Sequence, residues 1–173
     1  MHYLLVIDMQ VDFISGALGT PEAQAIVPAV AEKIRLFDGK VIATRDTHTP
    51  DYLHTQEGAN LPVPHCVCGT DGWQLDARIA EACGEAELID KPSFGSVALA
   101  QMLADRAQNG ETIESITLVG LCTDICVISN AMLLKAFLPE VPIAVESALC
   151  AGVTPESHLR ALETMKLCQI TIK

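Results

Sequence analysis

The feature that most restricts the possible folds of this chain is a regular alternation of short β-rich runs with longer helical segments. Short apolar runs are typical of buried strands, and amphipathic segments between them are typical of helices. We expect strands at Tyr3–Ile7, Lys40–Thr44, Glu87–Ile89, Ser115–Val119, Pro142–Val145 and Gln169–Ile172. We expect helices at Ala23–Phe37, Gln74–Cys83, Val97–Gln108, Ile125–Phe137 and Pro155–Leu167. Strands that alternate with helices predict an α/β fold with a parallel sheet covered on both faces.

Length and composition indicate one domain, residues 1–173, with a core built from Ala, Val, Ile and Leu. The chain has 173 residues, of which 50% are hydrophobic and only 4% aromatic, and no repeat or linker divides it. Its net charge of −11 argues against nucleic acid or an anionic membrane surface as a partner. No apolar stretch approaches the ~18 residues that we would expect of a membrane span.

The cysteines and the start of the chain bear on its compartment. Seven cysteines are an odd number, so they cannot all pair within one chain. No signal peptide is visible, because the start lacks a basic segment and has Asp8 directly after its apolar run. We therefore expect reduced cysteines and a cytoplasmic location. The Ile125–Phe137 helix is apolar nearly all round, so we expect it to be deeply buried or shared with another subunit of a homo-oligomer.

Chemically reactive side chains follow successive predicted strands. Asp8 ends the first strand, and Asp46 with His48 follows the second. Lys91 follows the third strand and Cys126 the fourth. Each residue alone has an ordinary explanation, such as a turn, a solvated strand end or a small buried thiol. Because open α/β sheets bind ligands beyond the carboxyl ends of their strands, the shared placement predicts one common site.

The segment Val119–Val127 predicts a strand that turns sharply into a helix. The first N–H groups of such a helix are unpaired and point at whatever occupies the turn. A cysteine there feels the positive helix end, which lowers its pKa and favours the thiolate. The same N–H groups can hold the negative oxygen of a tetrahedral intermediate. Cys126 is therefore a candidate nucleophile that stands in its own oxyanion hole.

A Pro-, Gly- and His-rich stretch from Asp46 to Gly72 is too long for an ordinary connection, so we expect it to be functional. It contains a cluster of ligand-type residues, Asp46, His48, His54 and His65. A carboxylate with imidazoles suits Zn²⁺, Fe²⁺ or Mn²⁺, because hard oxygen and borderline nitrogen ligands mix there. The stretch therefore predicts a divalent-metal site.

Several ordered motifs resemble the isochorismatase-like cysteine hydrolases and, within that superfamily, the nicotinamidases. The matching segments are Val6–Gln10 with Asp12 and Phe13, Thr44–His48, His65–Thr70, Lys91 and the turn Gly120–Cys126. The resemblance runs nearly from end to end. It implies a single-domain, three-layer α/β/α fold with a six-stranded parallel sheet. It also implies a metal-dependent hydrolase of a small amide, with nicotinamide converted to nicotinate and ammonia.

The resemblance implies roles for the residues at the strand ends. Asp8, Lys91 and Cys126 fall on an Asp–Lys–Cys triad, with Asp8 as general base and Cys126 as nucleophile. Lys91 would keep the carboxylate and the thiolate charged in a poorly solvated pocket. A cis peptide is implied between Leu121 and Cys122. Its use would be to aim the Cys122 N–H, beside that of Cys126, at the substrate oxygen.

The resemblance also implies the metal ligands. Nicotinamidases bind a divalent metal through an Asp and two His, which fall here on Asp46, His48 and His65. Some members add a third His eight residues after the Asp, where His54 stands. The metal would bind the ring nitrogen of the substrate or orient a water.

The substrate site departs from the pattern of the nicotinamidases. Phe13 is retained as one aromatic wall. A Trp commonly found three residues before the last metal His is replaced by Pro62, and another between the metal Asp and His is replaced by Thr47. The only tryptophan of the chain, Trp73, lies beyond His65. These changes leave the triad and the metal ligands intact but leave the substrate open.

Two alternatives follow. The chain could be another amidase of the same superfamily, acting for example on an N-carbamoyl compound. It could instead be a non-catalytic metal-binding or thiol redox protein, in which Cys126 is inert or forms a disulfide with Cys122. The intact Asp8–Lys91 pair argues against the second alternative.

Overall fold

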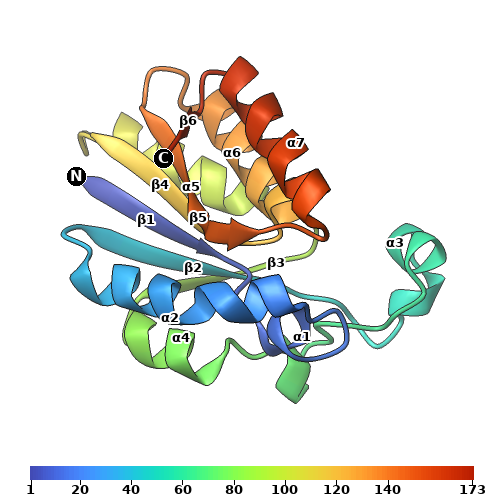
Figure 1. Ribbon diagram of the computed structural model, residues 1–173. Helices are drawn as coiled ribbons and strands as arrows, with labels where there is room; N and C mark the ends of the chain where they lie inside the picture. Colours follow the sequence, from blue (N-terminus) through green and yellow to red (C-terminus); the bar gives the residue numbers. More distant parts are fainter.

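The computed structural model describes residues 1–173 and shows one six-stranded parallel sheet between two layers of helices (Figure 1). The strands lie in the order β3-β2-β1-β4-β5-β6. Their bounds are β1 His2–Ile7, β2 Lys40–Asp46, β3 Glu87–Lys91, β4 Ser115–Leu121, β5 Ile143–Ala151 and β6 Thr171–Ile172. The predicted fold class is confirmed. The strand order reverses between β1 and β4, and the carboxyl ends of strands at such a point are where open α/β sheets bind ligands.

The helices cover both faces of the sheet. Figure 1 shows α2 and α4 on one face and α5, α6 and α7 on the other. Their bounds are α1 Val11–Ile14, α2 Pro21–Leu36, α3 Gln56–Asn60, α4 Ala77–Cys83, α5 Val97–Gln108, α6 Ile128–Phe137 and α7 Pro155–Leu167. The hydroxyls of Thr20, Ser96 and Thr154 accept backbone N–H groups at the starts of α2, α5 and α7, which stabilises these helix ends.

The side chains of β1 alternate between two apolar cores. Tyr3, Leu5 and Ile7 belong to a cluster of 22 buried residues that includes α5, α6 and α7. Leu4 and Val6 belong to a cluster of 16 buried residues that includes α2. Successive side chains of a strand point to opposite faces, so a strand buried on both faces is apolar at every position. This explains the continuous apolar run at the start of the sequence.

The ends of β1 and β4 approach each other closely at Gly120. Its φ of +115° is rarely adopted by L residues, and a Cβ there would collide with the backbone oxygen of Ile7. Glycine therefore lets the turn after β4 lie directly beside the end of β1. Asp8, the next residue of that strand end, has a φ of +48°, a conformation that Asp tolerates better than most residues.

The helix after β4 begins earlier than the sequence predicted. A π-helical turn at Thr123–Val127 precedes α6, and such turns are frequent at functional sites. Within α6, Asn130, Ala131 and Leu134 are buried, whereas Ala136 is exposed. The helix thus packs into the core of its own chain, and self-association stays a prediction.

The long stretch that follows β2 is partly helical. It forms 3₁₀ turns at Tyr52–His54 and Asp71–Trp73, with α3 between them. The Thr55 hydroxyl accepts the Gly58 N–H and so caps α3. In Figure 1, α3 lies beyond the carboxyl ends of the strands, outside the layers of the sheet. The stretch therefore covers the edge at which we expected the site.

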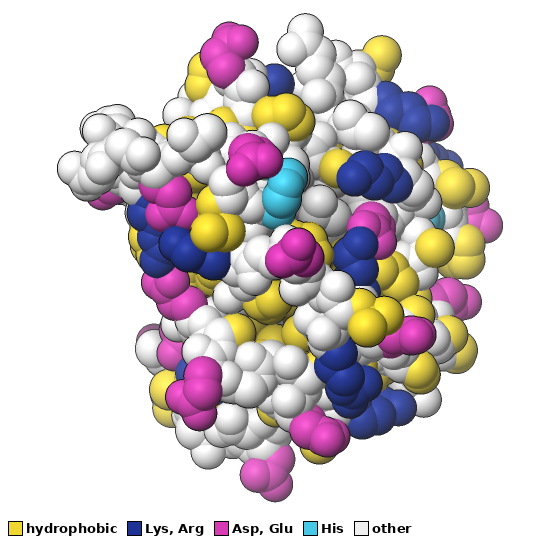
Figure 2. Space-filling model, turned by 90° about the vertical axis from the view of Figure 1, so that its left-hand side faces the viewer, with side chains coloured by type: hydrophobic (Ala, Val, Ile, Leu, Met, Phe, Trp, Pro, Cys, Tyr) yellow, Lys and Arg dark blue, Asp and Glu magenta, His cyan; other side chains and the backbone are white.

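The opposite end of the molecule, where the strands begin, carries a mixed surface (Figure 2). Acidic and basic side chains are interspersed there with small apolar areas. Ion pairs such as Lys40–Glu111 at 3.0 Å and Arg106–Glu87 at 2.6 Å join neighbouring elements. None of the helices combines the length and the apolar character needed to cross a membrane.

Candidate active site

Side chains from the carboxyl ends of β1 and β3 and from the turn after β4 meet in a buried triad. Lys91 Nζ lies 2.7 Å from Asp8 Oδ2 and 3.4 Å from Cys126 Sγ. Asp8 and Lys91 are fully buried, and Cys126 is nearly so. The structure thus brings together the three residues that the resemblance implied as a triad.

The position of Lys91 explains how it reaches both partners. It is the last residue of β3, where its backbone pairs with Asp46 at the end of β2. Its ammonium lies 3.2 Å from Asp46 Oδ1 and donates to the Ser93 carbonyl at 3.0 Å. Burial alone would lower the pKa of Lys91, but the anionic groups around it, Asp8 first, raise it overall. Lys91 therefore remains a cation within the site.

The two carboxylate oxygens of Asp8 have different partners. Thr44 Oγ1 donates to Asp8 Oδ1 at 2.6 Å and accepts the Asp8 N–H at 3.2 Å. Asp8 Oδ2 forms the ion pair with Lys91 and accepts no hydrogen bond. Burial raises the pKa of the Asp8 carboxyl, and Lys91 opposes this shift. A carboxyl group with a raised pKa can take up a proton, and Oδ2 is the oxygen that accepts no hydrogen bond.

The ionisation of Cys126 differs from the expectation. The pKa of the Cys126 thiol is raised well above its usual value, mainly because the group is buried. The Asp8 carboxylate raises this pKa further, and Lys91 opposes both effects. The prediction that the helix end lowers this pKa was wrong, because loss of hydration in a closed site outweighs a partial charge at a helix terminus. The resting group is therefore a neutral thiol that needs a base before it can attack.

The peptide bond between Leu121 and Cys122 is cis, as the resemblance implied. Both Cys122 and Cys126 line the cavity described below. Cys122 is the residue before the π-helical turn, and its carbonyl accepts the N–H groups of Ile125 and Val127 at 3.1 and 3.0 Å. The turn is thus closed on itself around Cys126, and the oxyanion-hole role of the two N–H groups remains a prediction.

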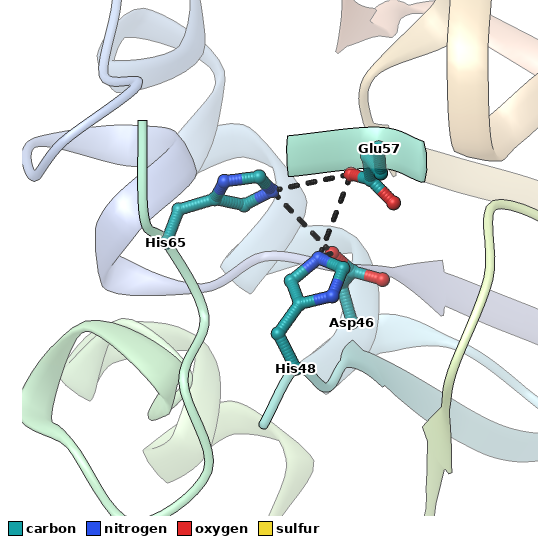
Figure 3. A group of neighbouring side chains, drawn as sticks. All are labelled: Asp46, His48, Glu57 and His65. Carbon is teal, nitrogen blue, oxygen red and sulfur yellow. Dashed lines mark ion pairs between the residues drawn. The ribbon is translucent and has the colours of Figure 1, made fainter. Parts of the chain in front are cut away.

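A second group of polar side chains, drawn in Figure 3, includes Asp46, which also contacts Lys91 of the triad. The ligand atoms of Asp46, His48, Glu57 and His65 all lie within 4.8 Å of one another. His48 Nε2 is 2.8 Å from Asp46 Oδ2, yet it is buried and has no hydrogen-bond partner. Two imidazoles and two carboxylates that converge in this way form a donor set suited to Zn²⁺, Fe²⁺ or Mn²⁺. The group therefore fits a divalent ion.

Hydrogen bonds orient the two histidines of this group. The His48 N–H donates to the Cys66 carbonyl at 2.9 Å, and the Cys68 N–H donates to the His48 carbonyl at 2.8 Å. His65 Nδ1 lies 2.8 Å from the Val63 carbonyl. Donation of the Nδ1 proton to that carbonyl leaves Nε2 with a lone pair facing the group, the arrangement found at metal-binding histidines.

His54 does not join the group, which corrects its prediction as a ligand. Its side chain is 81% exposed, and its Nδ1 lies 2.7 Å from Asp51 Oδ1. The 3₁₀ turn directs Tyr52 inward, against the His48 ring at 4.7 Å, and His54 outward. Glu57, from the first turn of α3, takes the fourth place. The sequence analysis missed Glu57, although the capping residue Thr55 is a signal that a helix starts there.

We call Asp46, His48, Glu57 and His65 the metal-type group. A cavity of about 730 Å³ opens beside this group and the triad. Phe13 lies on its wall with its ring 5.4 Å from that of His65, which agrees with its expected place. Trp73 is outside the cavity, because its Nε1 donates to Thr47 Oγ1 at 2.9 Å and its ring lies 3.6 Å from the Arg45 guanidinium. The second aromatic side chain on the cavity is Phe94, which the sequence analysis did not single out.

Comparison with known proteins agrees with this arrangement. The family model of the isochorismatase domain matches residues 2–172. The chain belongs to the isochorismatase family. Membership of the isochorismatase family, together with the buried Asp8, Lys91 and Cys126, points to hydrolase chemistry at the end of the sheet.

Several solved structures that resemble this chain are those of amidases. A pyrazinamidase from Pyrococcus horikoshii, solved in complex with zinc, is 30% identical with a TM-score of 0.80, over 99% of this chain and 98% of that one. A nicotinamidase/pyrazinamidase from Bacillus subtilis is 26% identical with a TM-score of 0.77, over 99% of this chain and 98% of that one. An N-carbamoylsarcosine amidase from Thermoplasma acidophilum is 25% identical with a TM-score of 0.76, over 99% of this chain and 95% of that one. These likenesses support an amidohydrolase without fixing its substrate.

Proposed function

We propose that this chain is a cysteine amidase that hydrolyses nicotinamide to nicotinate and ammonia. The observation that carries the proposal is the contact of one buried ammonium, Lys91 Nζ, with both Asp8 and Cys126. A general base, a cation and a thiol in contact beside a cavity form the arrangement that nucleophilic amide cleavage requires.

The chemistry follows from the states of these groups. Asp8 takes the proton of the Cys126 thiol while the sulfur attacks the amide carbonyl carbon. Lys91 stabilises the negative charge on both groups, and the N–H groups of Cys122 and Cys126 receive the oxyanion. The C–N bond then breaks, Asp8 returns the proton to the leaving nitrogen, and ammonia departs from an acyl thioester. Water deprotonated by Asp8 attacks the thioester, and the carboxylic acid leaves as the thiol is restored.

The metal-type group has a defined place in this proposal. Asp46, His48, Glu57 and His65 would hold a divalent ion, with zinc as the first choice, and the ion would supply a Lewis acid that can bind a pyridine nitrogen. The contact of Lys91 with Asp46 places this group next to the triad. A ring bound there would lie along the cavity between the two groups.

An N-carbamoyl amino acid is the second candidate substrate. The likeness to N-carbamoylsarcosine amidase and the presence of Pro62 and Thr47 in place of tryptophans favour it. The cavity argues for nicotinamide instead, because no Lys or Arg is among the residues that line it. A substrate carboxylate would have no protein cation to pair with there, whereas a neutral pyridine amide needs none.

The decisive experiment is the release of ammonia from nicotinamide by the metal-loaded protein. We expect turnover by the wild-type chain and by Cys68→Ala, which removes an exposed thiol outside the cavity. We expect none from Cys126→Ala, because the nucleophile is lost. Absence of turnover by a wild-type protein whose Cys126 can still be alkylated would reject nicotinamide as the substrate and keep the mechanism.

Metal binding gives a separate prediction. His48→Ala is expected to weaken binding of Zn²⁺ by more than the ~10–100-fold typical of losing an outer-shell partner, because it removes a direct ligand. His54→Ala is expected to leave binding unchanged, since that side chain is exposed and paired with Asp51. Competition with a chromogenic chelator measures both affinities. Equal losses in the two variants would show that His54 is a ligand after all.

A further inference from the structure

Three exposed apolar side chains lie together on the outer part of the cavity. Leu61, Phe94 and Val153 are 38%, 44% and 54% exposed, and all three line the cavity. Single exposed apolar residues are normal on a protein surface, but a group that shares one concave site marks a binding surface. Leu18 and Ile125, which are partly buried, also belong to the apolar lining.

These side chains come from separate parts of the fold that meet only at the cavity. Leu61 directly follows α3, Phe94 lies between β3 and α5, and Val153 lies between β5 and α7. The Val153 N–H donates to the Asp124 carboxylate at 3.1 Å, which ties its loop to the π-helical turn. Each wall of the outer cavity is therefore attached to an element of the triad or of the metal-type group.

The segment that carries Phe94 is held by buried groups. Lys91 Nζ donates to the Ser93 carbonyl at 3.0 Å, just before Phe94. Asn130, a buried residue of α6, donates to the Phe94 carbonyl at 3.2 Å and accepts the Ser96 N–H at 2.9 Å. The backbone around Phe94 is thus held on both sides, and its side chain lines the cavity.

The size and the charge of the cavity restrict what it can take. A volume of about 730 Å³ is within the range of pockets for drug-sized ligands, ~300–1,000 Å³. Nicotinamide is a single pyridine ring with one carboxamide and would leave much of this space empty. The carboxylate and imidazole side chains on the lining, Asp46, His48, Glu57 and His65, all belong to the metal-type group, and the polar side chains of α3 on the cavity, Gln56 and Asn60, are neutral.

We propose that the outer cavity is a subsite for an apolar substituent, so that the preferred substrates are neutral aromatic carboxamides larger than nicotinamide. This inference rests on the proposed amidase function. Phe94 and Leu61 contact the substituent, while the triad and the metal-type group act on the carboxamide and the ring. Burial of the substituent against these side chains lowers the free energy of the bound states, which appears as a higher kcat/KM.

The test compares nicotinamides that carry a methyl, ethyl or propyl group at each free ring position. The gain in kcat/KM over nicotinamide is at most about fourfold per buried methylene, and we expect roughly tenfold for propyl at the best position, because the mouth is partly open. Phe94→Ala and Leu61→Ser are expected to reduce the ratio of kcat/KM for propyl-nicotinamide to that for nicotinamide. Leu167→Ala, which removes an 87% exposed side chain outside the cavity, should leave the ratio as in the wild type.

The outcomes separate this inference from the proposed function. Turnover of nicotinamide with equal or slower turnover of every substituted amide would overturn the subsite and keep the nicotinamidase. Turnover of the substituted amides alone would support the subsite and reject nicotinamide as the substrate. Failure of the whole series would overturn both. A higher ratio in the wild type that Phe94→Ala and Leu61→Ser leave unchanged would show that another surface binds the substituent.

Discussion

Replacing Lys91 by methionine is expected to abolish hydrolysis and to lower the free energy of unfolding by about 3–5 kcal/mol. Methionine keeps a long apolar side chain but removes the ammonium, which lies 2.7 Å from Asp8 Oδ2 and 3.2 Å from Asp46 Oδ1. Both carboxylates are buried, so the variant must bury unpaired charge or protonate it. Urea-induced unfolding of the two proteins measures the difference.

Two controls identify the cause of the loss. Lys33→Met removes a partly exposed ion pair with Glu146, and we expect a change below about 1 kcal/mol. The double variant Lys91→Met/Asp8→Asn should recover part of the stability but no activity, because one of the two unpaired carboxylates is then neutral. Wild-type stability of Lys91→Met would show that the buried carboxylates do not depend on this cation.

The strands and helices were predictable where their apolar pattern is strong, and their ends were less so. The predicted bounds of α5 and α7 are those of the structure, because a hydroxyl cap and a continuous apolar face mark both helices. The last strand but one was predicted to end at Val145, but β5 continues to Ala151 past a register shift against β4. An irregularity of that kind depends on the neighbouring strand and leaves no periodic signal in the sequence.

The candidate site, like the fold, could be predicted from the sequence only in part. Asp8, Lys91 and Cys126 were predictable because strand ends of a parallel sheet converge, whatever the details of packing. Glu57 was not, because its place depends on how a short helix folds over the strand ends. The raised pKa of Cys126 was also out of reach, since it depends on the burial that the finished site imposes. The sequence therefore indicated which groups meet but not their ionisation.

Asp8→Asn is expected to lower the rate of hydrolysis by about 10²–10⁴-fold, the usual contribution of a general acid–base residue. Asparagine matches the shape of the carboxylate, tolerates the φ of +48° and can still accept the Thr44 hydroxyl. It cannot take the proton of Cys126 or return it to the leaving nitrogen. Ammonia release under single-turnover conditions measures the loss in the chemical step.

The reactivity of Cys126 in Asp8→Asn decides what Asp8 does. The Asp8 carboxylate raises the pKa of this thiol and Lys91 lowers it, so removal of the carboxylate should increase the thiolate fraction. Alkylation of Cys126 by iodoacetamide should therefore be as fast as in the wild type or faster, while hydrolysis falls. The rate must be read from the Cys126 peptide, because Cys68 and Cys168 are exposed and react as well. Alkylation that slows together with hydrolysis would show that losing Asp8 as the base for the thiol outweighs losing its repulsion of the thiolate, and the expected rise in thiolate fraction would be wrong.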